Sequence, residues 1–328
     1  MPRAWILRAG VLCGLCLFAQ NQLSPPAPSW YKGNLHTHTL NSDGDSSPDD
    51  VVRWYREHRY HFLVLTDHDY LTAVDGLNSV FGAAGKFLVV RGEEVSARFE
   101  KKPIHVNALN PRELIRPEAG VSVLDTLQRN VDAIRRAGGI PSVNHPNYGW
   151  ALTADDLRQV QNTRLFELYN GHSRVNNLGG GGAPSLEQVW DTLLTSGRRL
   201  YGVAVDDAHH FKQFAPDLNN PGRGWVAVRA AELSAAALLD ALERGDFYAS
   251  TGVVLSDVAP SPGALRVLIR AVDPFKYTTE FFGENGRVLK TTFDNPASCA
   301  LGPSDRYLRA RVTASNGEQA WTQPVFRD

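Results

Sequence analysis

Short apolar runs alternate with amphipathic stretches between residue 33 and about residue 250. The apolar runs, which have the length of buried parallel strands, cover residues 62–65, 87–90, 140–143, 165–169 and 201–205. Between them, apolar positions at helical spacing predict helices over residues 49–58, 121–137, 186–195 and 233–242. This alternation predicts an α/β fold, either a barrel or an open parallel sheet.

The pattern changes after residue 252. Stretches in which apolar and polar residues alternate replace the helical spacing, and they cover residues 265–269, 278–282, 288–292 and 307–312. Turn signals such as Asn285 followed by Gly286 separate these stretches. We therefore expect a barrel domain over residues 33–252 and a small antiparallel β-sandwich over residues 253–328.

The first residues have the pattern of an export signal. Arg3 and Arg8 precede an apolar stretch at 9–19, which is too short to span a membrane. We expect a signal peptide over residues 1–19, a proline-rich linker over residues 20–32, and a secreted or periplasmic protein. A lipid anchor on Cys13 or Cys16 is an alternative, although leucine precedes each of them where a small residue is expected.

Charge and cysteine content exclude some classes of protein. The chain has 328 residues and a formal net charge of −1, so charge alone predicts no binding to nucleic acid. Once a signal peptide is removed, Cys299 is the remaining cysteine, and no internal disulfide is expected.

Histidines and carboxylates gather at the ends of the predicted strands. His36 and His38 are two residues apart, so on a strand both imidazoles face one side. The clusters are His36, His38 and Asp43; Asp67, His68 and Asp69; Glu93, Glu94 and His105; His145; and Asp207 with His209. Taken alone, His105 or His145 is as readily a hydrogen-bonded residue as a ligand, and Asp67 could cap a helix. Their repetition at successive strand ends predicts one shared metal site for Zn, Mn or Fe.

These blocks, in this order, resemble the PHP (polymerase and histidinol phosphatase) family of metallohydrolases. The resemblance implies a distorted (β/α)7 barrel that holds two to three divalent metal ions. It assigns His36, His38, Glu94 and Asp207 to a first metal, and Glu94, His105 and His145 to a second. Asp43, His68 and His209 would hold a third, with Asp43 where many members have histidine. The family's Gly-x-Glu spacing favours Glu94 over Glu93 as the shared ligand.

The predicted activity is hydrolysis of a phosphoester on a small molecule, with a multinuclear metal site that activates water. We expect catalytic roles for Asp67, Glu94 and Asp207, with Asp67 orienting ligand imidazoles or donating a proton to the leaving group. The predicted substrate-binding residues, all placed in loops at strand ends, are Arg98, Asn170, His172 and Arg174.

Other functions stay open. Residues 247–252 and 320–326 resemble a secreted branch of the family grouped with carbaryl hydrolase, which implies carboxylic or carbamate ester hydrolysis on the same metals. A secreted metal-binding module without turnover is a further alternative. The complete set of ligand residues disfavours it, because sites that have lost their activity usually lose ligand residues as well. An amidohydrolase barrel also opens with an HxH pair, but the Ser42–Asp43–Gly44 and Thr66–Asp67–His68 blocks do not belong to that pattern.

Overall fold

The computed structural model describes residues 1–2 and 28–327. The expected signal peptide and most of the expected linker lie outside these residues. Strand β1 begins at Ser29, within the last residues of the expected linker. The strand forms there because its backbone pairs on both sides, with β2 and with β8. Among the described residues, no helix combines the length and the apolar character needed to cross a bilayer.

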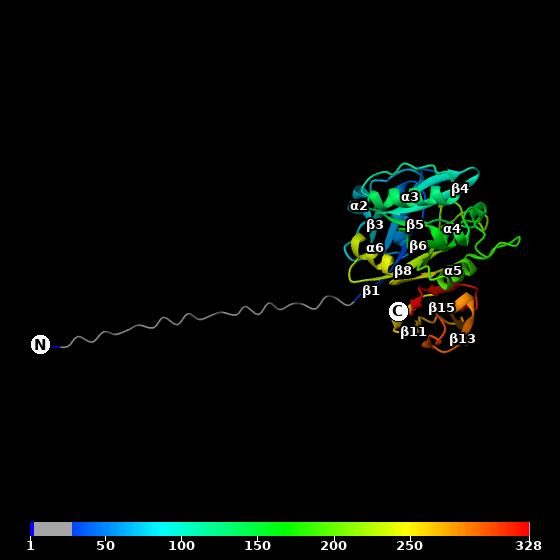
Figure 1. Ribbon diagram of the computed structural model, residues 1–328. Helices are drawn as coiled ribbons and strands as arrows, with labels where there is room; N and C mark the ends of the chain where they lie inside the picture. The colour runs from blue at the N-terminus through cyan, green and yellow to red at the C-terminus, as the bar shows by residue number, and fades with distance from the viewer. Residues whose placement is uncertain (3–27, 328) are drawn as a thin grey trace.

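Between residues 28 and 252, the structure has nine strands and six α-helices. Figure 1 shows their arrangement. The strands are β1 (Ser29–Asn34), β2 (Phe62–Leu65), β3 (Leu88–Phe99), β4 (Lys102–Leu109), β5 (Ile140–Val143), β6 (Leu165–Asn170), β7 (Tyr201–Val205), β8 (Trp225–Ala230) and β9 (Phe247–Ser250). The helices are α1 (Pro48–Glu57), α2 (Asp75–Phe81), α3 (Val123–Arg136), α4 (Ala154–Gln159), α5 (Leu186–Thr195) and α6 (Ala235–Arg244), with a 3-10 turn η1 (Tyr148–Trp150).

Local signals at the helix ends explain why the helix predictions lie close to the structure. Ser47, Ser122, Ser185 and Ser234 each cap a helix by accepting a hydrogen bond from a backbone N–H in its first turn. Gly245 closes α6 in the left-handed conformation, at φ 77°. The two unpredicted helices, α2 and α4, have seven and six residues, which is too short for a helical period to be recognised.

The main sheet is mixed, which corrects the expectation of a parallel sheet. The ladders β1–β2–β3 and β5–β6–β7 are parallel. However, β4 is antiparallel to both β3 and β5, and β8 is antiparallel to β1. A tight turn at Glu100, with φ 54°, joins β3 to β4, and two strands joined so closely can only pair antiparallel. The apolar pattern did not reveal this hairpin.

The two sides of this sheet approach each other beyond the strand ends. An isolated parallel bridge joins Thr37, just after β1, to Ala208, just after β7. His38 N–H donates to the carbonyl of Ala208 at 2.9 Å, and Asp207 N–H donates to the carbonyl of His36 at 2.9 Å. The segments that follow β1 and β7 are thereby fixed beside each other.

The last quarter of the chain forms eight more strands. They are β10 (Leu255–Ser261), β11 (Ala264–Ile269), β12 (Tyr277–Phe282), β13 (Val288–Thr292), β14 (Ala297–Ala300), β15 (Tyr307–Ala314), β16 (Gln319–Thr322) and β17 (Val325–Phe326), with a 3-10 turn η2 (Glu284–Gly286). β10, β11 and β14 form a separate three-stranded sheet, whereas β12, β13, β15 and β16 continue the main sheet.

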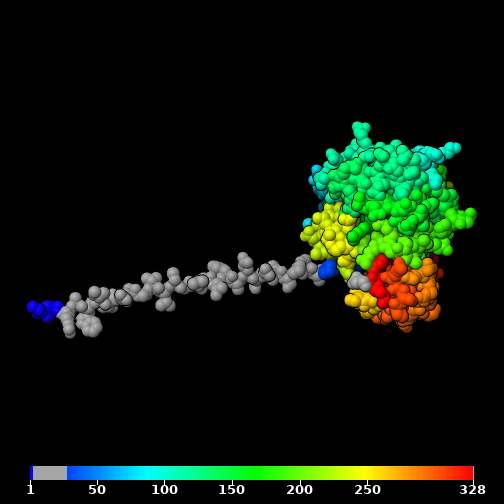
Figure 2. Space-filling view, viewed as in Figure 1, coloured from blue at the N-terminus to red at the C-terminus, as the bar shows by residue number. Residues whose placement is uncertain are grey.

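The ladder between β16 and β9 joins the two regions of the chain. Ala320 pairs with Ser250, and Thr322 pairs with Tyr248. One apolar core contains Trp225 and Tyr248 from the first region together with Val267 and Leu308 from the second. Figure 2 shows the C-terminal residues, in orange and red, packed directly below the green part of the molecule. Backbone hydrogen bonds and a shared core therefore cross the boundary expected at residue 252.

Candidate metal centre

The structure brings all nine predicted ligand residues together. Seven lie in segments that follow strands, whereas Glu94 and His105 lie within β3 and β4, which corrects the expectation that each cluster ends a strand. The residues come from the segment after β1 (His36, His38, Asp43), after β2 (His68), from β3 and β4 (Glu94, His105), after β5 (His145) and after β7 (Asp207, His209). Because β1 and β7 are fixed side by side beyond their ends, residues about 170 positions apart in sequence meet.

Glu94 lies at the middle of this cluster, with its side chain 1% exposed. Its Oε2 atom lies 3.1 Å from His36 Nε2, 3.2 Å from His38 Nε2 and 3.2 Å from His68 Nδ1. Its Oε1 atom lies 2.9 Å from His105 Nδ1 and 3.2 Å from His145 Nε2. One carboxylate thus faces two separate sets of imidazoles.

Glu93, the neighbouring carboxylate, points away from the cluster. It accepts a hydrogen bond from the backbone N–H of Ile115 at 2.9 Å, and its Oε1 atom has no partner. Burial raises the pKa of Glu93 to about 7. The geometry agrees with the choice of Glu94 over Glu93.

Asp207 completes the set around His36 and His38. Its Oδ1 atom lies 3.3 Å from His36 Nε2 and 3.2 Å from His38 Nε2. Asp207 has φ 50° and His145 has φ 23°, so both residues adopt the left-handed region directly after their strands. This conformation costs free energy in residues other than glycine and turns each side chain out of the strand path and into the site.

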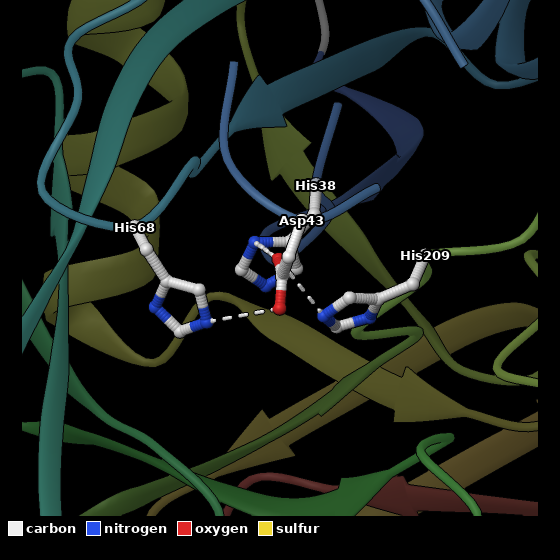
Figure 3. A group of neighbouring side chains, drawn as sticks. All are labelled: His38, Asp43, His68 and His209. Carbon is white, nitrogen blue, oxygen red and sulfur yellow. Dashed lines mark ion pairs between the residues drawn. The ribbon is translucent and has the colours of Figure 1, made fainter. Parts of the chain in front are cut away.

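Asp43 forms a more open third group with three imidazoles (Figure 3). Its carboxylate lies 3.3 Å from His209 Nε2, 3.5 Å from His38 Nδ1 and 3.8 Å from His68 Nε2. The Asp43 side chain is 56% exposed, whereas those of Glu94 and Asp207 are buried. The third group is therefore the one in direct contact with solvent.

The donor atoms fit divalent metal ions. His36 Nε2 and His38 Nε2 lie only 3.1 Å apart, are fully buried, and share Glu94 and Asp207 as neighbours. Two ring nitrogens this close repel unless a cation or proton lies between them. Imidazole nitrogen together with carboxylate oxygen is the donor set of Zn, Mn or Fe sites. The residues present therefore suit the metals that the sequence implied.

The electrostatics of the cluster point the same way. Burial lowers the pKa of His38, but hydrogen bonds and charges from Asp207 and Glu94 outweigh it and raise that pKa to about 9. Burial likewise opposes ionisation of Glu94, yet His68, His36 and His105 hold its pKa well below the usual value. The site thus stabilises positive charge among the imidazoles and keeps its central carboxylate ionised.

Glu167, on β6, is a contact residue that the sequence analysis missed. It lies 2.6 Å from His36 Nδ1 and accepts hydrogen bonds from His145 N–H at 2.7 Å and from Asn170 at 2.8 Å. It orients His36 from the side opposite Glu94. The available signal was one acidic residue inside the apolar run 165–169, where burial of an unpaired charge is costly.

Asp67 does not contact an imidazole, so its expected role in orienting ligand histidines is corrected. Its carboxylate accepts from the Thr39 backbone N–H at 2.7 Å, from the Thr39 hydroxyl at 2.9 Å, and from Ser42 and Thr72 at 2.9 and 2.8 Å. These donors occupy it fully. Its link to the site is indirect, because Ser42 lies 3.3 Å from His38 Nδ1.

The predicted substrate-binding residues separate into three cases. His172 lines the cavity above the cluster, where its ring lies 5.6 Å from that of Tyr148 and 5.7 Å from that of His209. Asn170 is buried and donates to Asp207 Oδ2 at 3.0 Å, so it supports a ligand residue. Arg98 and Arg174 are exposed and are not among the residues that line the cavity.

The cavity has a volume of about 100 Å³. It is lined by Asp43, His68, Glu94, His105, His145, Tyr148, His172, Asp207 and His209. Since a water molecule takes about 30 Å³ of liquid, the cavity holds a few waters or the reacting group of a substrate. Burial lowers the pKa of His172 to about 4, so this imidazole is neutral at physiological pH.

Comparison with known proteins extends this description. No protein-family model matches the chain. A segment of 78 residues is 35% identical to the 5'-3' exoribonuclease Rnm of Salmonella typhimurium and, equally, of Escherichia coli. That segment is 24% of this chain and 27% of each of those proteins, so the chain matches about a quarter of the length of these relatives.

One solved structure matches nearly the whole chain. It is a two-domain protein from Bacteroides vulgatus that contains a predicted PHP-like metal-dependent phosphoesterase. The two share a TM-score of 0.53 and 14% identity over 92% of this chain and 98% of that one. At this identity the likeness establishes a common fold, a mixed α/β architecture built on a large sheet.

Proposed function

We propose that this protein is a metal-dependent hydrolase of the PHP family, and specifically a phosphoesterase. The observation that carries the proposal is the buried carboxylate of Glu94, whose two oxygens face two different sets of imidazoles. A carboxylate in this position bridges two metal ions in multinuclear hydrolases. The fold shared with the Bacteroides vulgatus protein supports the same conclusion.

Three groups of residues would hold two to three divalent ions. The groups are His36, His38, Glu94 and Asp207; Glu94, His105 and His145; and Asp43, His68 and His209. Bound there, such metals supply an activated water and positive charge for the developing oxyanion.

The surrounding residues position these groups. Glu167 and Asn170 fix His36 and Asp207 by hydrogen bonds. Tyr148 and His172 form an aromatic wall of the cavity, against which the group leaving the phosphorus would lie. Asp67 holds the segment from Thr39 to Ser42 and therefore acts on the site through the backbone. Substrate binding by Arg98 and Arg174, which are exposed and do not line the cavity, stays a prediction.

An activity screen tests the proposal. The full-length protein is assayed with Mn or Zn on p-nitrophenyl phosphate, bis-p-nitrophenyl phosphate and a naphthyl ester. We expect turnover of a phosphoester, and a loss of orders of magnitude in the Glu94→Gln variant, together with lower metal content by elemental analysis. Cleavage of the naphthyl ester alone would instead establish the carboxylic or carbamate esterase suggested by the resemblance to carbaryl hydrolase.

Architecture and location complete the proposal. We infer that β1 to β8 and their helices form the distorted (β/α)7 barrel of residues 33–252, and that the strands of residues 253–328 form a β-sandwich. The bridge between Thr37 and Ala208 supports the barrel, and the common core of β10, β11, β12 and β15 supports the β-sandwich.

We also propose that residues 1–19 direct export of the protein. Mass spectrometry of the protein recovered outside the cytoplasm tests this, because cleavage would remove the mass of those residues.

A further inference from the structure

A groove lined by arginines lies at the end of the strands opposite the metal centre. Its residues precede β6 and β7 or end α3 and α6, elements that can be followed in Figure 1. Arg164 precedes β6 and Asn170 ends it, and six residues of strand span about 20 Å at roughly 3.3 Å each. The groove is therefore separate from the cluster around Glu94.

Five guanidinium groups and one carboxylate line this groove, which has a volume of about 820 Å³. Arg135 pairs with Glu243, and Arg244 pairs with Asp240. Arg164, Arg198 and Arg199 have no carboxylate within ion-pair distance among residues 28–327. The groove therefore has an excess of positive charge that the described part of the chain does not neutralise.

The arginines are held in place by neutral groups. Arg198 donates to the carbonyls of Val160 and Thr163 at 2.6 and 3.1 Å. Arg199 stacks on the ring of Phe326 at 4.7 Å, and Arg164 donates to the carbonyl of Glu243 at 3.4 Å. Burial lowers the pKa of Arg198, and the positive charge of Arg164 lowers it further. Fixing several guanidinium groups together is unfavourable without an anion.

We propose that this groove binds a compact polyphosphate, such as inorganic triphosphate or the phosphate chain of an organic triphosphate. A guanidinium group can bind two phosphate oxygens at once. The exposed Arg164 and Arg199 would make such contacts, and Arg198, whose Nε and Nη2 already donate to backbone carbonyls, would add positive charge beside them. The lining contains arginine, asparagine, threonine and glutamate, without an aromatic platform for a nucleobase. This composition favours a small polyphosphate over a nucleic acid strand. The proposal does not depend on the activity of the metal centre.

Calorimetric titration with inorganic triphosphate tests the proposal. The full-length Glu94→Gln variant, freed of metal with a chelator that is then removed, serves as the background, so that no bound metal ion contributes to the binding of triphosphate. We expect Arg164→Gln with Arg199→Gln, both at exposed positions, to weaken binding by about tenfold or more and to reduce its salt dependence. The matched control replaces Arg56 and Arg270, two exposed arginines outside the groove, by glutamine and should bind like the background protein.

A second measurement covers the case that Glu94→Gln does not fold. The melting temperature of the wild-type protein should rise with inorganic triphosphate, and the rise should be lost in the Arg164→Gln/Arg199→Gln variant. Equal binding or equal rises in variant and control would overturn the proposal. Arginine-dependent binding of a single-stranded RNA decamer, with none of triphosphate, would also overturn it, because the ligand would then be a nucleic acid.

Discussion

At the scale of single residues, the site depends on side chains that do not bind metal themselves but form hydrogen bonds with the predicted metal-ligating residues. Glu167 contacts His36 Nδ1 and the backbone of His145 at once. A carboxylate behind a ligand imidazole fixes its tautomer and raises its basicity. A residue without any direct part in metal binding can therefore set the affinity of the site.

Glu167→Gln should lower the affinity for Mn or Zn by roughly 10- to 100-fold, because it removes the negative charge behind His36 while it keeps the shape of the side chain. Competition with a chromogenic chelator measures this affinity. Glu113→Gln, at an exposed position far from the cluster, is the control and should match the wild type. Unchanged affinity in Glu167→Gln would show that the contact is structural only.

A second prediction concerns Lys32, whose ammonium lies 3.9 Å from the ring of Tyr60 and 5.0 Å from that of Trp225. Burial lowers the pKa of Lys32 from 10.5 to about 8, against the opposing charge of Asp206. The folded state then binds fewer protons than the unfolded state between pH 8 and 10.5. The contribution of Lys32 to the free energy of unfolding should therefore rise with pH across that window.

Urea unfolding of the wild type and of Lys32→Met checks this sign. From pH 7.5 to pH 10.5, the wild type should gain at most about 3 kcal/mol relative to the variant. Lys86→Met, at an exposed position, should show no such pH-dependent difference. A difference for Lys32→Met that stays constant with pH would mean that the folded state does not shift this pKa.

At the scale of elements, the contact between α5 and β15 combines burial with charge. Arg309 on β15 is fully buried and binds Asp191 of α5 through two hydrogen bonds of 2.7 and 2.6 Å. The Tyr307 hydroxyl donates to the same carboxylate at 2.8 Å. Removing one partner would leave the other charge buried without compensation.

Arg309→Met should lower the free energy of unfolding by roughly 3–5 kcal/mol, because the buried Asp191 then keeps the Tyr307 hydroxyl as a donor but loses the positive charge that balances it. The double variant Arg309→Met/Asp191→Leu should recover part of that loss. Denaturant unfolding of both variants measures the two values, with Arg306→Met at an exposed position as the control. If the double variant is less stable than the single one, charge pairing is not the source of the effect.

How far the sequence predicts these elements depends on the kind of signal each one has. Capped helices and apolar strands such as residues 140–143 and 201–205 follow from local patterns, and they match the structure. The β3–β4 hairpin was missed because charged residues at its turn interrupt the apolar run. The cluster was foreseeable from histidines and carboxylates at strand ends. Glu167 was not singled out, and sequence spacing does not reveal that Arg98 and Arg174 lie outside the lining of the cavity.

At the scale of the whole molecule, the two regions of the chain form one hydrogen-bonded body. β16 lies between β9 and β15, and the core around Trp225 and Tyr248 extends into β11 and β15. A chain that ends at residue 252 would expose the edge of β9 and part of this core. Such an unpaired apolar edge promotes aggregation.

We therefore expect the truncated chain to be aggregated or poorly folded, in contrast to the full-length protein. Size-exclusion chromatography and near-ultraviolet circular dichroism distinguish these states. A monomeric truncated protein that binds metal with native affinity would show that the last 76 residues, 253–328, are dispensable for the barrel.

The left-handed backbone at His145 and Asp207 limits how the selectivity of this centre can be re-engineered. A residue that replaces the metal-ligating side chain at His145 or Asp207 must also tolerate a positive φ. Asparagine, aspartate and glycine adopt such torsions with least cost, whereas branched substitutes such as threonine or valine do not. Libraries aimed at a different ion should therefore vary His105 or His68 first, where the chain imposes no such restriction.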